Sequence, residues 1–278
     1  MNYVMYKKVL VVIGIVALIA GGASAQSVAK KKERKGEFYF SWGYNKEWYT
    51  QSDLHVSQPG LGNDYVLKAV KASDKPGWDE NLLGKAISIP QYNYRIGYIF
   101  NRKKGLGFEI NFDHTKYIIY DQMVHMEGTY QGQSVNTNKV FARTNDSSTN
   151  SYYFLNNGAN FLLFNIVKRS NLYEAKNHKV KVDFLGKAGI GPVIPHVENC
   201  FWGVANDPHF QIGGWNIGLE ACIRTTFFNS FFLEYCNKID YARYSGLRIN
   251  SGTAHQAFGT YEMILNLGYT LPMGRKVN

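Results

Sequence analysis

Opposite charges and two cysteines between Phe210 and Arg243 are spaced so that they could form a ladder. Apolar residues occupy every second position on both sides of Asn229, a pattern typical of two strands joined by a turn. Folding about Asn229 brings six side chains into three facing pairs: Glu220 with Lys238, Cys222 with Cys236, and Arg224 with Glu234. Such pairs could line a narrow ion path or hold a lumen closed, and the two cysteines could form a disulfide or remain two thiols.

A second segment repeats this arrangement. Folding residues 91–118 about Arg102-Lys103-Lys104 places Arg95 near Glu109, again on the polar side of two alternating strands. An eight-stranded barrel is just wide enough for side chains to fill it, and buried charges are tolerated when they are paired. We therefore interpret the charged positions as structural ion pairs that fill a lumen.

Nucleophilic chemistry has one candidate group, Ser251, His255 and Glu262. A serine nucleophile needs a base within hydrogen-bond reach, and the base needs an orienting acid. On a strand rising ~3.3 Å per residue, His255 and Glu262 would be about 23 Å apart. The sequence therefore predicts no catalytic residues, although an enzyme that modifies lipid A or phospholipid stays an alternative.

Metal chemistry has weak support. His196 and His209 flank a segment that contains Glu198, Cys200 and Asp207, but their spacing matches no zinc pattern. Cys200 has no evident disulfide mate. We predict neither a metal nor another cofactor.

The N-terminal sequence indicates whether the apolar faces of these strands contact lipid or a protein core. Lys7 and Lys8 precede an apolar run over residues 9–20, and Ala23-Ser24-Ala25 offers a small-residue cleavage site. This pattern predicts a signal peptide over residues 1–25 and an exported protein, which also makes nucleic acid an unsuitable partner. In an exported chain the apolar faces can meet lipid while the charged faces line a lumen.

Period-two alternation predicts eight strands long enough to cross a membrane on a tilt. They cover about 37–48, 91–101, 105–118, 152–166, 179–192, 210–227, 231–243 and 256–271. The expected fold is all-β, an antiparallel up-and-down transmembrane β-barrel with eight strands, or ten if the first loop adds two. The barrel domain is expected over 37–272, between a basic lead-in at 26–36 and a tail at 273–278.

The connections between these strands alternate between long and short, as external loops and periplasmic turns do in outer-membrane barrels. The first long loop contains Ser52–Asp74, which we expect to form a short hairpin above the membrane. The second, Tyr120–Ser151, is rich in Gln, Asn, Ser and Thr, and we expect it to be exposed and mobile. Aromatic residues make up 15% of a chain with a formal charge of +10, a composition that suits a barrel with aromatic girdles.

Four features of the chain are shared with one family: the strand count, the loop alternation, the signal peptide and the aromatic last strand, Tyr261-Glu262-Met263-Ile264-Leu265-Asn266-Leu267-Gly268-Tyr269. In these features the chain resembles the small outer-membrane barrels of Gram-negative bacteria, of OmpA-like and OmpX-like type. The resemblance implies an outer-membrane location and contact with membrane lipid and lipopolysaccharide. It also implies insertion by the barrel assembly machinery, and long loops that could bind a cell-surface ligand. Members often end at an aromatic residue, whereas here Pro272–Asn278 follow the last strand.

These observations favour a structural or interaction role at the cell surface. A small pore or transport-related barrel is the first alternative, and the lipid-modifying enzyme is the second. A soluble barrel of lipocalin type would invert the faces, with the aromatic residues inside around an apolar ligand and the charges in water.

Overall fold

The computed structural model describes residues 33–77, 91–155 and 157–277, and this part of the chain is nearly all β-strand. Residues Arg34–Val277 form one compact unit. The predicted signal peptide lies outside the described residues, as does most of the basic lead-in. Within the described ranges, no helix has the length and apolar character that a membrane crossing requires.

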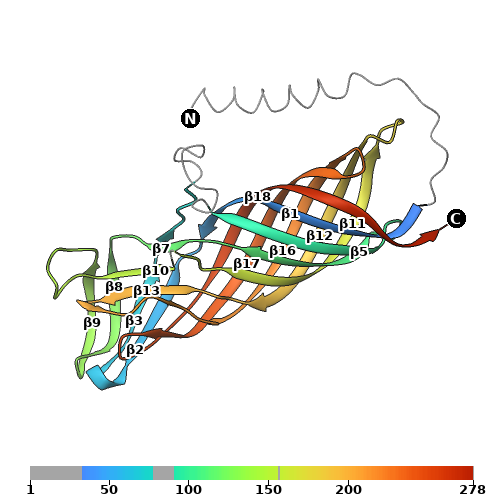
Figure 1. Ribbon diagram of the computed structural model, residues 1–278. Helices are drawn as coiled ribbons and strands as arrows, with labels where there is room; N and C mark the ends of the chain where they lie inside the picture. Colours follow the sequence, from blue (N-terminus) through green and yellow to red (C-terminus); the bar gives the residue numbers. More distant parts are fainter. Residues whose placement is uncertain (1–32, 78–90, 156, 278) are drawn as a thin grey trace, which may run out of the picture. The chain divides into compact units, whose positions relative to one another are not determined.

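Eight antiparallel strands close into a barrel, because the first strand pairs with the last (Figure 1). In order around the wall they are β1 (Glu33–Tyr49), β5 (Tyr92–Asn101), β6 (Leu106–Asp113), β11 (Phe161–Glu174), β12 (Val180–Pro192), β16 (Gly214–Phe227), β17 (Phe231–Ile249) and β18 (Gly252–Val277). The predicted fold class is confirmed, with eight strands in the closed wall. Closure leaves no free edge in this part of the sheet.

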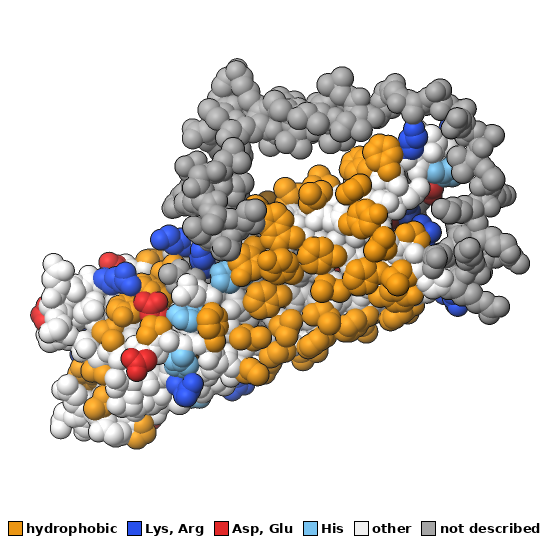
Figure 2. Space-filling model, in the orientation of Figure 1, with side chains coloured by type: hydrophobic (Ala, Val, Ile, Leu, Met, Phe, Trp, Pro, Cys, Tyr) orange, Lys and Arg blue, Asp and Glu red, His pale blue; other side chains and the backbone are white. Residues whose placement is uncertain are grey.

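Side chains alternate across the wall as the sequence predicts. Ile96, Leu219 and Leu265 point outward and are about half exposed, whereas Arg95, Glu234 and Asn266 point inward and are buried. Apolar side chains spread over the barrel wall in Figure 2. This apolar exterior around a charged interior is the arrangement of a barrel that meets lipid, so the soluble barrel with inverted faces is wrong.

The strand boundaries differ from the predicted ones where backbone breaks occur. The strand expected over 152–166 is two separate strands, β10 (Tyr152–Leu155) and the barrel strand β11. Between them, Gly158 and Asn160 adopt φ angles of 122° and 39°, which a continuous strand cannot accommodate. The strand expected over 105–118 leaves the barrel at Asp113, and the last strand, expected to end at residue 271, runs to Val277.

The long connections build a second structure, here called the loop module. It comprises the residues between the barrel strands at the end opposite the short turns, together with the end of β17 after Tyr241 and the facing start of β18 before Gly259. From β18 the barrel sheet continues through β2 (Ser52–Gln58), β3 (Asn63–Val70), β8 (Gln122–Tyr130) and β9 (Gln133–Phe141). A second sheet packs beside it. It contains β4 (Ala72–Ser73), β7 (Tyr117–Ile119), β10, β13 (His196–Phe201), β14 (Val204–Ala205) and β15 (His209–Phe210). A 3-10 turn, η1 (Pro59–Leu61), joins β2 to β3.

The predicted hairpin over Ser52–Asp74 is confirmed, since β2 pairs with β3. The expectation for Tyr120–Ser151 holds for exposure, since much of β8 and β9 is exposed, but residues 122–141 form the regular β8–β9 hairpin, which pairs with β3. Its turn needs two positive φ angles, and Gln131 and Gly132 supply 51° and 75°. Although polar, this segment keeps Val124 and Met126 facing an apolar core, and that alternation holds the hairpin in place.

Candidate functional site

The charged hairpin has the register that the sequence indicates. Strands β16 and β17 pair Glu220 with Lys238, Cys222 with Cys236, and Arg224 with Glu234 as Cα partners. Every one of these side chains faces the lumen and is buried. Residues that face each other in the register nevertheless do not always form the predicted ion pair, because their long side chains reach across the lumen to residues on other strands.

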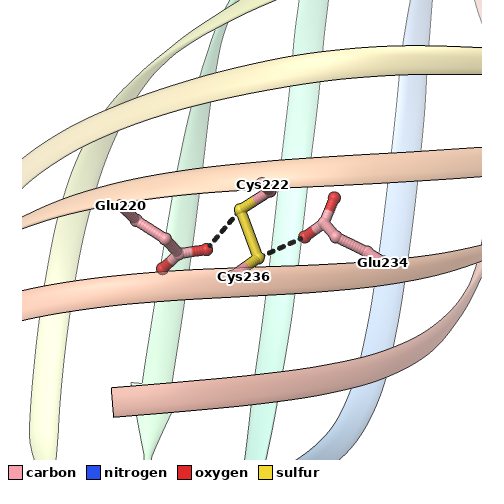
Figure 3. Close-up of side chains that lie close together, drawn as sticks. All are labelled: Glu220, Cys222, Glu234 and Cys236. Atoms are coloured by element: carbon pink, nitrogen blue, oxygen red, sulfur yellow. Dashed lines mark hydrogen bonds between the residues drawn. A yellow bond between two sulfur atoms is a disulfide. The ribbon is translucent and has the colours of Figure 1, made fainter. Parts of the chain in front are cut away.

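The two lumen cysteines form a disulfide between β16 and β17. Figure 3 shows the bridge between two carboxylates, with Cys222 Sγ 3.0 Å from Glu220 Oε1 and Cys236 Sγ 3.5 Å from Glu234 Oε1. Four potential metal-ligand atoms lie within 4.8 Å of one another in this group. The donor set does not fit a metal, because bridged sulfurs carry no thiolate charge and lysine or arginine side chains already pair with both carboxylates. Cys200 is a buried free thiol.

Lys187 on β12 is the centre of the first ionic layer. Its Nζ lies 3.0 Å from Glu109, 2.8 Å from Glu220 and 3.0 Å from Glu234. Arg224 completes the layer through the predicted pair with Glu234, at 2.6 Å from Nε to Oε2. One ammonium therefore joins carboxylates from three strands across the lumen.

Lys238 on β17 is the centre of the second ionic layer. Its Nζ lies 2.6 Å from Asp113, 2.6 Å from Asp240 and 3.1 Å from Glu262. In the described residues Lys238 thus pairs with these three carboxylates and not with Glu220, its register partner. Glu220 and Lys238 lie on the same face of the hairpin, but each pairs with charged groups on other strands: Glu220 with Lys187 and Arg95, and Lys238 with Asp113 and Glu262.

Arg95 connects the two layers. Its guanidinium contacts Asp113 at 2.9 Å and Glu220 at 3.1 Å. The predicted partner, Glu109, instead accepts a hydrogen bond from the Tyr39 hydroxyl at 2.7 Å and pairs with Lys187. The reason is register: Gly97, not Arg95, lies opposite Glu109, so the tight turn at residues 102–105 shifts the expected pairing by two residues.

Buried aromatic rings lie in the lumen above and below the two charged layers. Toward the short turns, the Arg224 guanidinium lies over Tyr39 and Phe232, at 4.2 and 4.0 Å from the ring centroids. Toward the loop module, the rings of Tyr117 and Phe258 stack at 4.3 Å, and Tyr244 stacks on Phe258 at 5.3 Å. These buried rings separate the charged layers from both ends, and the arrangement suits a plug better than an ion path.

A buried acidic pair that sequence reasoning missed lies where the barrel meets the loop module. The backbone N–H of Glu47 donates to Asp74 Oδ2 at 2.9 Å, and the Gln91 amide donates to Glu47 Oε2 at 2.7 Å. Burial raises the pKa of Asp74 to about 6. The inward parity of Glu47 on β1 was readable from the sequence, but its contact with the distant Asp74 was not.

The candidate catalytic and metal groups are not assembled. His255 Nδ1 accepts the Gly246 N–H at 3.2 Å, while the Ser251 hydroxyl donates to Asn250 Oδ1 at 2.7 Å. Glu262 is bound to Lys238 inside the lumen. His209 on β15 lies opposite Val197, the residue after His196. The His196 ring packs against Phe210, whereas His209 Nδ1 lies within hydrogen-bond distance of the Asp207 carbonyl.

No protein-family model and no curated protein matches the chain. Among solved structures it is similar to the outer membrane protein OprG of Pseudomonas aeruginosa, at 10% identity over 87% of this chain and 98% of that one, with a TM-score of 0.37. It is also similar to the outer membrane protease OmpT of Escherichia coli, at 8% identity over 89% and 100%, with a TM-score of 0.37. A third is Ail, the attachment invasion locus protein of Yersinia pestis, at 13% identity over 85% and 99%, with a TM-score of 0.32. These scores are low, so the fold assignment is based on the strand register and the apolar exterior.

Proposed function

We propose that this protein is an integral outer-membrane β-barrel of a Gram-negative bacterium, and that its closed barrel anchors the loop module at the cell surface for an interaction role. The observation that carries the proposal is the module's own apolar core. Leu54, Leu67 and Met126, from three neighbouring strands, are fully buried there. Loops that served only as connections would not need such a core.

The chain's two exteriors support the proposed location. The wall around the barrel is apolar and would contact membrane lipid, with lipopolysaccharide in the outer leaflet. The module has charged and polar side chains on its outer surface, such as Asp53, Lys68 and Glu127. Insertion would depend on the barrel assembly machinery, and export on the signal peptide predicted over residues 1–25.

The edge strand β9 is the part of the module best suited to an interaction. It is the last strand of the sheet order, so one side of its backbone has no strand partner among the described residues. Lys139, its single charged residue, lies over the Tyr130 ring at 4.1 Å instead of guarding that edge. An unguarded edge can add an extended segment of another protein as a further strand.

Site-specific labelling tests the location and orientation. A cysteine at the exposed position Leu61 of the module should react with a membrane-impermeant maleimide on intact cells. A cysteine at Lys103, in a short turn at the other end, should react only after permeabilisation. The Cys200→Ala substitution removes the native free thiol from both variants. Recovery of the chain as a soluble periplasmic protein would refute the proposal.

Adherence tests the interaction role. A non-adherent laboratory strain that displays the chain should bind cultured epithelial cells more than the same strain with an empty vector. Asn136→Pro, which blocks strand addition at β9, should remove the gain while labelling at Leu61→Cys stays unchanged. Equal adherence of the vector and display strains would refute this role.

Pore and enzyme functions have less support. Buried aromatic rings lie in the lumen on both sides of the two charged layers. Glu262 pairs with Lys238, while His255 and Ser251 have hydrogen-bond partners of their own. Planar-bilayer recordings separate plug from pore: a plug should give no steady conductance steps, and large steady steps would show a pore.

A further inference from the structure

A group of oxygen atoms lies around the acidic pair Glu47 and Asp74, where the barrel meets the loop module. Glu47 is an inward residue near the end of β1, Asp74 follows β4, and Gln91 precedes β5, so three separate segments supply the group. The Gln91 amide donates to Glu47 Oε2 at 2.7 Å, and the Asp74 carboxyl lies within hydrogen-bond reach of both other side chains. Glu47 and Gln91 are buried, whereas Asp74 is half-buried.

Neither carboxylate of this pair has a lysine or arginine partner in the described residues. The second ionic layer does not supply one, because Lys238 is already shared by Asp113, Asp240 and Glu262. Asp113 and Glu262 instead add negative charge near Glu47. Because unpaired buried carboxylates are unfavourable, the pair needs either a proton or a bound cation.

The Gln91 side chain is the observation that favours a cation. Its amide oxygen, Oε1, is buried and accepts no hydrogen bond from the described residues. The nitrogen of the same amide is bound to Glu47, which holds Oε1 beside the carboxylates. Asn93, the next inward residue of β5, is fully buried, and neither polar atom of its amide has a partner in this part of the chain. A proton shared by two carboxylates leaves an amide oxygen unsatisfied, whereas a hard cation binds oxygens of both kinds.

We propose that Glu47, Asp74 and Gln91 hold a calcium ion at the junction between the barrel and the loop module. Ca²⁺ takes about six to eight oxygen ligands in a flexible geometry, and carboxylates, amide oxygens and waters are its usual ligands. Half-burial of Asp74 gives the ion an entry from solvent and leaves room for water ligands on that side. The ion neutralises the pair and links the end of β1 to the residues that follow β4 and precede β5.

Terbium luminescence tests the proposal. The folded chain, in a phosphate-free nonionic detergent, is titrated with Tb³⁺, which replaces Ca²⁺ among oxygen ligands and is excited through nearby rings such as Tyr49, two residues after Glu47. Luminescence should saturate, and Ca²⁺ should displace it. Asp74→Asn and Glu47→Gln should each raise the apparent dissociation constant at least tenfold, because each removes a charged ligand. Gln91→Leu should raise it by a smaller factor, because it removes a neutral ligand.

Glu127→Gln is the matched control, because it removes an exposed carboxylate from the loop module and should leave the constant unchanged. Heat-modifiable gel migration checks that each variant retains a folded barrel, and the wild-type titration decides alone where a variant does not fold. No saturable signal from the folded wild-type chain, or an unchanged constant for Asp74→Asn, would overturn the calcium site. Because the measurement is made in detergent, that failure would leave the proposed outer-membrane location untouched.

Discussion

The barrel and the loop module bury opposite kinds of side chain although they share strands. On β17, the inward positions Glu234, Lys238 and Asp240 are charged, and the next two, Ala242 and Tyr244, are apolar. The outward positions change in the reverse direction, from Ile239 and Tyr241 to Arg243 and Ser245. The parity of the strand does not change at residue 241. What changes is the surrounding solvent, which the structure indicates is lipid below this level and water above it.

The two interiors therefore depend on different forces. Water outside the module favours apolar burial in its core. Lipid outside the barrel removes that driving force, so the lumen is held by hydrogen bonds and paired charges.

Lys187→Met tests the lumen. It leaves the carboxylates of Glu109, Glu220 and Glu234 without their shared ammonium, and we expect the barrel to lose about 3–5 kcal/mol of stability. Urea unfolding in lipid vesicles, followed by Trp fluorescence, measures the loss. Lys181→Met on the same strand is the control, because Lys181 is partly exposed and pairs only at the end of the lumen. Similar losses for both variants would contradict a charge-held interior.

Leu67→Ala tests the module. Leu67 is fully buried among apolar side chains, and its truncation should destabilise the module by about 3 kcal/mol. The barrel should keep its heat-modifiable migration, because its ion pairs are untouched. Limited proteolysis of the module in intact vesicles reads the local effect, with Val66→Ala, which faces outward on β3, as the control. A barrel that unfolds with the module would show one cooperative unit.

Cys222→Ser with Cys236→Ser tests how much the lumen depends on its covalent link. The disulfide closes a loop with a sequence separation of 14, and its removal should cost about 2 kcal/mol. The same unfolding assay with and without reductant measures this cost, since wild type should respond to reductant and the double variant should not. An equal response of the two proteins to reductant would contradict the prediction.

The acidic pair at the junction makes local stability depend on pH. Burial raises the pKa of Asp74 from 3.8 to about 6, so the folded state holds this proton more tightly than the unfolded state does. Stability at this contact should therefore be greatest below about pH 4 and fall as pH rises through about 6. The hydrogen-exchange protection factor of the Glu47 amide, which donates to Asp74, should fall over this range. Asp74→Asn should flatten the profile, and a wild-type profile that is already flat would contradict the assignment.

Local pattern predicted much of the barrel. Alternation gave the inward faces of β5, β6, β16 and β17, and the turn at Asn229 gave the register that pairs Cys222 with Cys236. Alternation did not separate β10 from β11, because Phe161–Phe164 is apolar at every position. The break before this run depends on backbone contacts between distant residues, such as the hydrogen bond that the Ala159 N–H donates to the Thr115 carbonyl at 2.7 Å. The β8–β9 hairpin was missed because its polar composition concealed the buried Val124 and Met126.

Which side chains face inward follows from the order of residues alone, since the period of a strand is two and needs no tertiary information. Which inward charges meet depends on the folded barrel. Closing the wall brings β6, β12 and β17 around one lumen, so Lys187 reaches Glu109 and Lys238 reaches Asp113 across gaps that no local spacing encodes. The fold also makes the long loops share one apolar core, because burial there depends on strands from three separate connections packing with the ends of β17 and β18.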